Sequence, residues 1–167
     1  MLRLGIVFFL VFLTACDVPF VPSKQEAIEQ YLEESAPLVE ASEQLDQGLF
    51  EHLSSTEEFV VKADEVKRIL AMQQQLYDQL KNTSAPYDMV ELKKIYLSLI
   101  DERMEQQKHF LPLLYREQQK SVDVLVETYK QQDAQRMTAA LEGVNGLVEP
   151  YGIERKTLHS EKNDKKE

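Results

Sequence analysis

The stretch from residue 59 to residue 80 reads FVVKADEVKRILAMQQQLYDQL and gives the clearest indication of the fold. One set of its positions recurs at alternating steps of four and three residues: Phe59, Ala63, Val66, Leu70, Gln73, Tyr77 and Leu80. Side chains at this spacing share one face of an α-helix, and the pattern is typical of a seam between packed helices. A capping-box pattern with Ser55 and Glu58 predicts where this helix begins. The stretch therefore predicts an amphipathic helix that packs against others.

The residues before this stretch predict a first helix. Ser23 and Glu26 form a capping-box pattern, and apolar residues follow at helical spacing as far as Phe50. Pro37 predicts a kink or a brief break, because a proline inside a helix removes a backbone hydrogen bond. Gly48 predicts a weakened end, because glycine is a poor helix former.

The residues after this stretch predict two more helices. A short polar turn should join the second and third helices into a hairpin. The third helix is expected to start near residues 84–86 and to carry its apolar stripe to Tyr129. We expect Pro112 to kink this long helix rather than break it, because no capping residue precedes Pro112. Asp133 is the expected N-cap of a last helix that ends before Pro150.

These patterns together predict an all-α protein, an antiparallel bundle of about four helices. Five Gly and six Pro among 167 residues argue against an all-β protein, which needs many tight turns. The bundle domain is expected over residues 24–153. Residues 154–167 are rich in charge and are expected to form a disordered tail.

The composition excludes several classes of protein. The chain has 19 Lys and Arg against 29 Asp and Glu, a net charge of −10, which argues against a nucleic-acid partner. A single cysteine excludes an intramolecular disulfide and a zinc site built from several cysteines.

The N-terminus has the layout of an export signal. Arg3 supplies a positive charge, residues 4–13 form an apolar run, and the small residues Thr14 and Ala15 precede Cys16. The apolar run is only half as long as the about 20 residues that a membrane-spanning helix needs. The pattern therefore predicts a removable signal rather than a permanent transmembrane anchor.

The four residues Leu13-Thr14-Ala15-Cys16 resemble the lipobox of bacterial lipoproteins at every position. The resemblance implies cleavage between Ala15 and Cys16 and attachment of a diacylglyceryl group with fatty-acid chains such as palmitate to the Cys16 thiol. An ordinary secretory site prefers small residues at positions −3 and −1, and Leu13 at −3 fits this poorly. The alternative is a plain signal peptide, cleaved after Cys16.

On the lipoprotein interpretation, residues 1–15 are the signal peptide and residues 16–23 are the lipidated cysteine with a short tether. Two prolines in the tether favour an extended path. Removal of the signal changes the net charge from −10 to −11, because Arg3 is its only charged residue. In lipoproteins of enteric bacteria, an aspartate at the place of Asp17 retains the protein on the inner membrane. The predicted location is the extracytoplasmic face of the cell membrane.

The sequence contains no recognisable catalytic or metal-binding motif. A di-iron bundle needs Glu-x-x-His pairs. None of His52, His109 and His159 has a glutamate three residues before it. Glu105 and His109 lie one helical turn apart and could share a metal, although a solvated ion pair is the favoured interpretation. Neither a Gly-x-Ser-x-Gly nucleophile motif nor a glycine-rich phosphate loop is present. We therefore predict no catalytic residue, no cofactor, no metal and no enzymatic activity.

Three glutamines, Gln73, Gln107 and Gln118, fall near seam positions. If these glutamines are buried, they should fix the register of the helices. The alternative is that they line a cavity for a small molecule. The functional hypothesis is a lipid-anchored, extracytoplasmic bundle that contacts another envelope protein and is not an enzyme. The alternative hypothesis is a module that binds a small molecule or lipid at the membrane surface. The pattern specifies neither the protein partner nor the oligomeric state.

Overall fold

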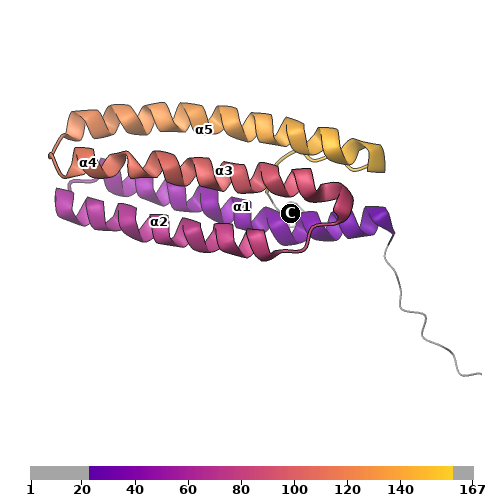
Figure 1. Ribbon diagram of the computed structural model, residues 1–167. Helices are drawn as coiled ribbons and strands as arrows, with labels where there is room; N and C mark the ends of the chain where they lie inside the picture. Colours follow the sequence, from indigo (N-terminus) through magenta and orange to yellow (C-terminus); the bar gives the residue numbers. More distant parts are fainter. Residues whose placement is uncertain (1–22, 160–167) are drawn as a thin grey trace, which may run out of the picture.

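The computed structural model describes residues 23–159, which form an antiparallel bundle of helices (Figure 1). In spatial order around the bundle, α1 packs on α2, α2 on α3, α3 on α5, and α5 on α1. The prediction of an all-α antiparallel bundle with a hairpin of its second and third helices is therefore confirmed. The predicted signal peptide, Ala15, Cys16 and the tether through residue 22 lie outside the described residues. The elements are α1 (Lys24–Ser54), α2 (Phe59–Asn82), η1 (Tyr87–Met89), α3 (Val90–Lys108), α4 (Phe110–Leu114), α5 (Gln119–Val148) and η2 (Glu149–Tyr151).

The predicted start of α1 is confirmed, and Pro37 does not break the helix. The Ser23 Oγ accepts a hydrogen bond from the Glu26 backbone N–H at 3.2 Å, and Glu26 Oε2 accepts one from the Ser23 N–H at 2.7 Å. Pro37 lies inside a helix that continues to Ser54. Its buried neighbours Ala36 and Val39 hold the helix in the core, and this packing outweighs the local cost of the proline.

The predicted capping box of α2 is also wrong. Ser55 is the C-cap of α1, and its hydroxyl donates to the His52 carbonyl at 2.7 Å. Glu58 occupies the N-cap position of α2 without a side-chain capping bond. The connection is stabilised instead by the buried Lys62, whose ammonium donates to the carbonyls of Leu53 at 3.0 Å and Ser55 at 2.7 Å.

The third helical segment consists of α3 and α4, which follow each other in nearly the same direction (Figure 1). Pro112 lies within α4, and the predicted kink of this segment is minor. The segment does not continue to Tyr129, because the chain reverses over residues 115–118, where Glu117 has a φ of 54°. Gln118 is the N-cap of α5, and Asp133 lies in the middle of that helix. The prediction of Asp133 as an N-cap is therefore wrong.

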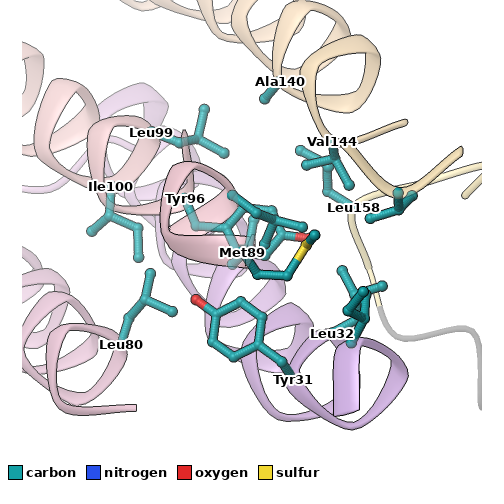
Figure 2. Packing of buried hydrophobic residues seen from close by; sticks show 14 of the residues in the cluster. Tyr31, Leu32, Leu80, Met89, Tyr96, Leu99, Ile100, Ala140, Val144 and Leu158 are labelled. Carbon is teal, nitrogen blue, oxygen red and sulfur yellow. The ribbon is translucent and has the colours of Figure 1, made fainter. Parts of the chain in front are cut away.

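The core is divided into two apolar clusters along the length of the bundle. The first core lies at the end where α1 begins and includes Tyr31, Tyr96 and Val144 (Figure 2). The second core lies toward the α4–α5 turn and includes Phe110 and Tyr129. Between the two cores, the buried positions are occupied by polar and charged side chains.

The last described residues pack on the bundle, so the predicted boundary at residue 153 is too early. Leu158 is only 2% exposed and joins the first core beside Leu32 and Val144 (Figure 2). The Asn145 side chain exchanges two hydrogen bonds of 2.8 Å with the backbone of Arg155. The prediction of a disordered tail is therefore wrong for residues 154–159, and residues 160–167 lie outside the described range.

Candidate functional site

A layer of buried polar side chains crosses the bundle between the two cores, and all four long helical segments contribute to it. The contributing residues share low exposure and converge on one guanidinium and two carboxylates. We call this set the polar layer. Its members are Ser42 and Asp46 from α1, Gln73 from α2, Arg103 and Gln107 from α3, and Tyr129 and Asp133 from α5.

Arg103 is the centre of the polar layer and is 0% exposed. Its guanidinium makes a bidentate pair with Asp133, with Nε–Oδ1 and Nη2–Oδ2 distances of 2.9 Å. Its Nη1 donates to the Ser42 hydroxyl at 3.1 Å, and its Nε lies 3.3 Å from Asp46 Oδ2. Burial alone would lower the pKa of Arg103, but Asp133 and Asp46 outweigh burial and raise it. Arg103 therefore remains charged and joins α3 to both α1 and α5.

Asp46 is the second carboxylate of the layer and receives hydrogen bonds from several helices. Tyr129 donates its hydroxyl to Oδ2 at 2.8 Å, Gln73 donates to Oδ1 at 3.3 Å, and Gln107 donates to the same oxygen. Burial raises the pKa of Asp46 to about 6, although Arg103, Tyr129 and Gln107 oppose the rise. Burial and the Asp46 charge also raise the pKa of the Tyr129 phenol above its usual value.

The polar layer joins the helices to one another. Its side chains are paired with one another, and none of them lines either of the two grooves described below. Gln73 also donates to the Ser42 carbonyl at 2.9 Å, so α2 is joined to α1 through two acceptors. Because three other helical segments bond to Asp46 or Ser42 of α1, the layer specifies one axial alignment of the helices.

The structure brings together only part of what the sequence predicted for this layer. Gln73 and Gln107 are buried, which agrees with the register-fixing interpretation, whereas Gln118 is exposed at the start of α5. The predicted sites do not include Arg103, Asp46 or Asp133. A signal for Asp46 was present: it continues the seam spacing of four and three residues that runs through Ser42 and Leu49 of α1. A charged residue at a seam position was the sign of a buried pair.

The candidate metal pair does not form. Glu105 pairs with Lys108 rather than with His109, which is exposed. His52 lies near Glu57 and Glu65, and His159 Nε2 lies 2.5 Å from Glu43 Oε2, so the three histidines are dispersed. Over residues 23–159, no three His, Cys, Asp or Glu side chains are grouped closely enough to hold a metal ion.

A groove of about 620 Å³ lies open on the surface between α3 and α5. Its rim carries the ion pairs Lys94–Glu91 at 2.6 Å and Arg136–Glu102 at 3.1 Å. A Cβ at Gly143 would come within 3.1 Å of Ile95 Cδ1, so a larger residue there would crowd the floor. A second open groove of about 460 Å³ lies between α4 and α5, around Leu125. We call the larger one the α3/α5 groove, with a floor of Ile95, Leu99, Ala139, Ala140, Gly143 and Leu147.

The fold and the polar layer define the class of this protein as an all-α bundle of four helical segments with a charged layer in its core. Comparisons with known protein families, with curated proteins and with solved structures find no match. Among the helices of the described range, none has a stretch long and apolar enough to cross a membrane.

Proposed function

We propose that the protein is a lipid-anchored, extracytoplasmic accessory protein that acts by contact with another envelope protein and not by catalysis. The observation that carries the proposal is the α3/α5 groove. Its floor is apolar, it is open along the bundle, and its rim charges are already paired with each other. An open apolar surface with a polar rim is typical of a protein interaction site.

The lipobox-like residues Leu13–Cys16 supply the location in this proposal. Two acyl chains hold a protein at a membrane where a single chain gives only marginal binding. A protein held at the membrane in this way meets its partner in two dimensions, so a groove of moderate affinity is sufficient. The polar layer contributes a rigid bundle on which the groove keeps its shape.

The alternative, a module that binds a small molecule or lipid, requires an enclosed pocket with converging polar groups. Both described grooves are open to solvent, and the buried amide oxygens of Gln73 and Gln107 that lack partners line neither of them. No specific observation on residues 23–159 favours this alternative, so protein contact is the function that we propose.

Site-specific photocrosslinking in intact envelopes tests the partner contact. A photoreactive amino acid at Ala139, exposed in the α3/α5 groove, should give a discrete crosslinked protein. The same amino acid at Ala71, exposed on α2, is the matched control and should give none. Ala139→Glu should abolish co-purification of that protein. Absence of a groove-specific crosslink, together with a bound small molecule in native mass spectrometry, would favour the alternative.

Replacement of the lipidated residue tests the anchor. Cys16→Ser should abolish incorporation of labelled palmitate and leave an N-terminus without acyl mass, because a serine hydroxyl cannot form the thioether. The measurements are palmitate labelling and the intact mass of the purified chain. Asp17→Ser is the control outside the lipobox and should retain the label. If the Cys16→Ser variant and the protein with Cys16 incorporated equal amounts of labelled palmitate, this result would contradict the lipoprotein assignment.

A further inference from the structure

Tyr87 is the most exposed large apolar or aromatic side chain on the described part of the molecule. It lies in η1 between α2 and α3 and is 93% exposed. Val90, at the start of α3, is 43% exposed on the same end of the bundle. The combination of an aromatic body and a hydroxyl suits a boundary that is apolar on one side and wet on the other.

The position of Tyr87 is next to the start of α1. Lys24 Nζ, at the first residue of α1, lies 2.7 Å from Oδ2 of Asp88, the residue that follows Tyr87. The Tyr151 hydroxyl of η2 lies 3.4 Å from the same oxygen. The start of α1, η1 and η2 therefore meet at one end of the bundle (Figure 1). We call this the η1 end.

The chain length between Cys16 and the bundle decides which end is nearest to the lipid. Residues 17–22 separate Cys16 from Ser23, and seven fully extended steps span at most about 25 Å. By contrast, α1 has 31 residues and is about 46 Å long, so the opposite end lies much farther from the anchor. The net charge of −11 after signal removal opposes lying flat on an anionic surface.

We propose that the η1 end rests on the phospholipid bilayer and that Tyr87 enters the headgroup region. This inference rests on the proposed lipid anchor. The exposed surface around Tyr87 contacts the interface between lipid and water, where tyrosine is enriched in membrane proteins. The anchor supplies a high effective concentration of lipid, so a weak contact of one aromatic ring is sufficient to orient the bundle.

The charges near Tyr87 favour an interfacial contact over an electrostatic one. Lys24 is paired with Asp88, and Lys94 is paired with Glu91. Lys93 donates to the carbonyls of Lys81 at 2.6 Å and Thr83 at 2.7 Å, where it caps the end of α2. Because these cations already have partners, the contact should form on zwitterionic lipid and should change little with salt.

Tryptophan fluorescence tests the orientation directly, because the chain contains no Trp. The lipidated full chain carrying Tyr87→Trp is reconstituted in phosphatidylcholine vesicles with and without brominated acyl chains. We expect a blue-shifted emission that is partly quenched by brominated lipid, as for a side chain at interfacial depth. Tyr115→Trp is the matched control at the opposite end, where Tyr115 is 62% exposed, and its emission should stay water-like and unquenched.

The outcomes separate this inference from the proposed function. If the lipidated protein floats with the vesicles but the fluorescence of Tyr87→Trp is not quenched, the anchor is retained and the proposed orientation is overturned. Equal quenching at both positions means that the bundle lies flat, which also overturns the orientation. Failure of the lipidated protein to float with the vesicles overturns the anchor and the inference together. The screening length of charges is near 10 Å at about 0.1 M salt, so 0.5 M salt, about five times that ionic strength, screens them strongly. Quenching that disappears in 0.5 M salt would contradict the interfacial contact.

Discussion

Arg103 offsets part of the negative charge of the polar layer, since it lies between Asp46 and Asp133. Two carboxylates around one guanidinium leave a net negative charge when all three are ionised. Removing charges from water is costly, and buried pairs often contribute less to stability than apolar residues of the same size. We infer that this layer contributes alignment of the helices more than it contributes free energy of folding.

Arg103→Met should therefore destabilise the protein strongly, because it leaves the buried Asp46 without its paired cation and leaves Asp133 with only the more distant Arg136, at 3.8 Å. We expect a loss of about 3–5 kcal/mol in the free energy of unfolding, measured by urea denaturation at pH 7. Arg68→Met, which removes an arginine exposed at the surface from its pair with Glu65, is the control and should cost less than about 1 kcal/mol. Equal losses of unfolding free energy in the two variants would show that the Arg103 pair contributes no more to stability than an ion pair exposed at the surface.

The protonation of Asp46 should make stability depend on pH between about 4 and 6. Burial raises the folded-state pKa of Asp46 to about 6, above the ordinary aspartate value of 3.8, so the folded protein binds more protons than the unfolded chain in this range. The contribution of Asp46 to stability is therefore fully present below pH 4 and is lost as the pH rises through 6. Two pKa units correspond to about 3 kcal/mol.

The matching measurement is urea denaturation of the unmodified protein and Asp46→Asn at several pH values between 4 and 7. Asparagine resembles the protonated carboxyl and does not titrate. The stability of the unmodified protein should fall relative to that of the variant as the pH rises, and then level off. A constant difference across the range would contradict the raised pKa.

At the scale of elements, the seam spacing predicted the helices, and local end signals were less informative. The capping box at Ser23 is correct, because the Ser23 hydroxyl accepts from the Glu26 N–H as the pattern requires, whereas the Ser55 hydroxyl donates to the His52 carbonyl at the end of α1. Asp133 has the residue type of an N-cap, but its partner Arg103 is 30 residues away in the sequence. Local patterns do not show such a partner, because the contact exists only after two helices pack.

The same reasoning explains the missed reversal between α4 and α5. The apolar stripe continues in sequence from Leu114 to Val122 at near-helical spacing, although the chain turns between them. Both residues are buried in the second core, so packing requires apolar residues on each side of the turn. The turn contains neither Gly nor Pro, and a glutamate occupies the left-handed position.

Glu117 should therefore be a site of local strain. A non-glycine residue with a φ of 54° costs about 1–2 kcal/mol relative to an ordinary conformation. Glu117→Gly should raise the free energy of unfolding by up to about 1 kcal/mol, and Glu117→Val should lower it, because β-branched residues tolerate this conformation least. Thermal denaturation of both variants provides the measurement. A stabilising valine would be incompatible with the left-handed turn.

At the scale of the whole molecule, the bundle has two different ends. The η1 end gathers the start of α1, the α2–α3 connection and η2, while the opposite end carries the α4–α5 turn (Figure 1). The α3/α5 groove runs along the half nearer the η1 end, since it is lined by Glu91 and Leu147. On the proposed orientation, a partner in the groove would therefore contact the bundle close to the membrane surface.

The last described segment closes the side of the bundle between α1 and α5. Leu158 fills the first core, the Asn145 side chain binds the Arg155 backbone, and His159 reaches Glu43 of α1. Direct packing between α1 and α5 is less extensive than that between the other neighbouring helices. The segment from Ile153 to His159 therefore acts as a strap across the weakest seam.

Two truncations separate this strap from the residues after it. Ending the chain after Gly152 removes Leu158, worth about 2–3 kcal/mol when fully buried, together with the bonds to Asn145. We expect the midpoint of thermal unfolding to fall by about 10 °C. Ending the chain after His159 retains these contacts and should change the midpoint by no more than about 1 °C, as expected for exposed terminal residues. If the shorter chain unfolded at the same temperature as the longer one, the strap would contribute nothing, and the α1–α5 seam would be closed by the helices alone.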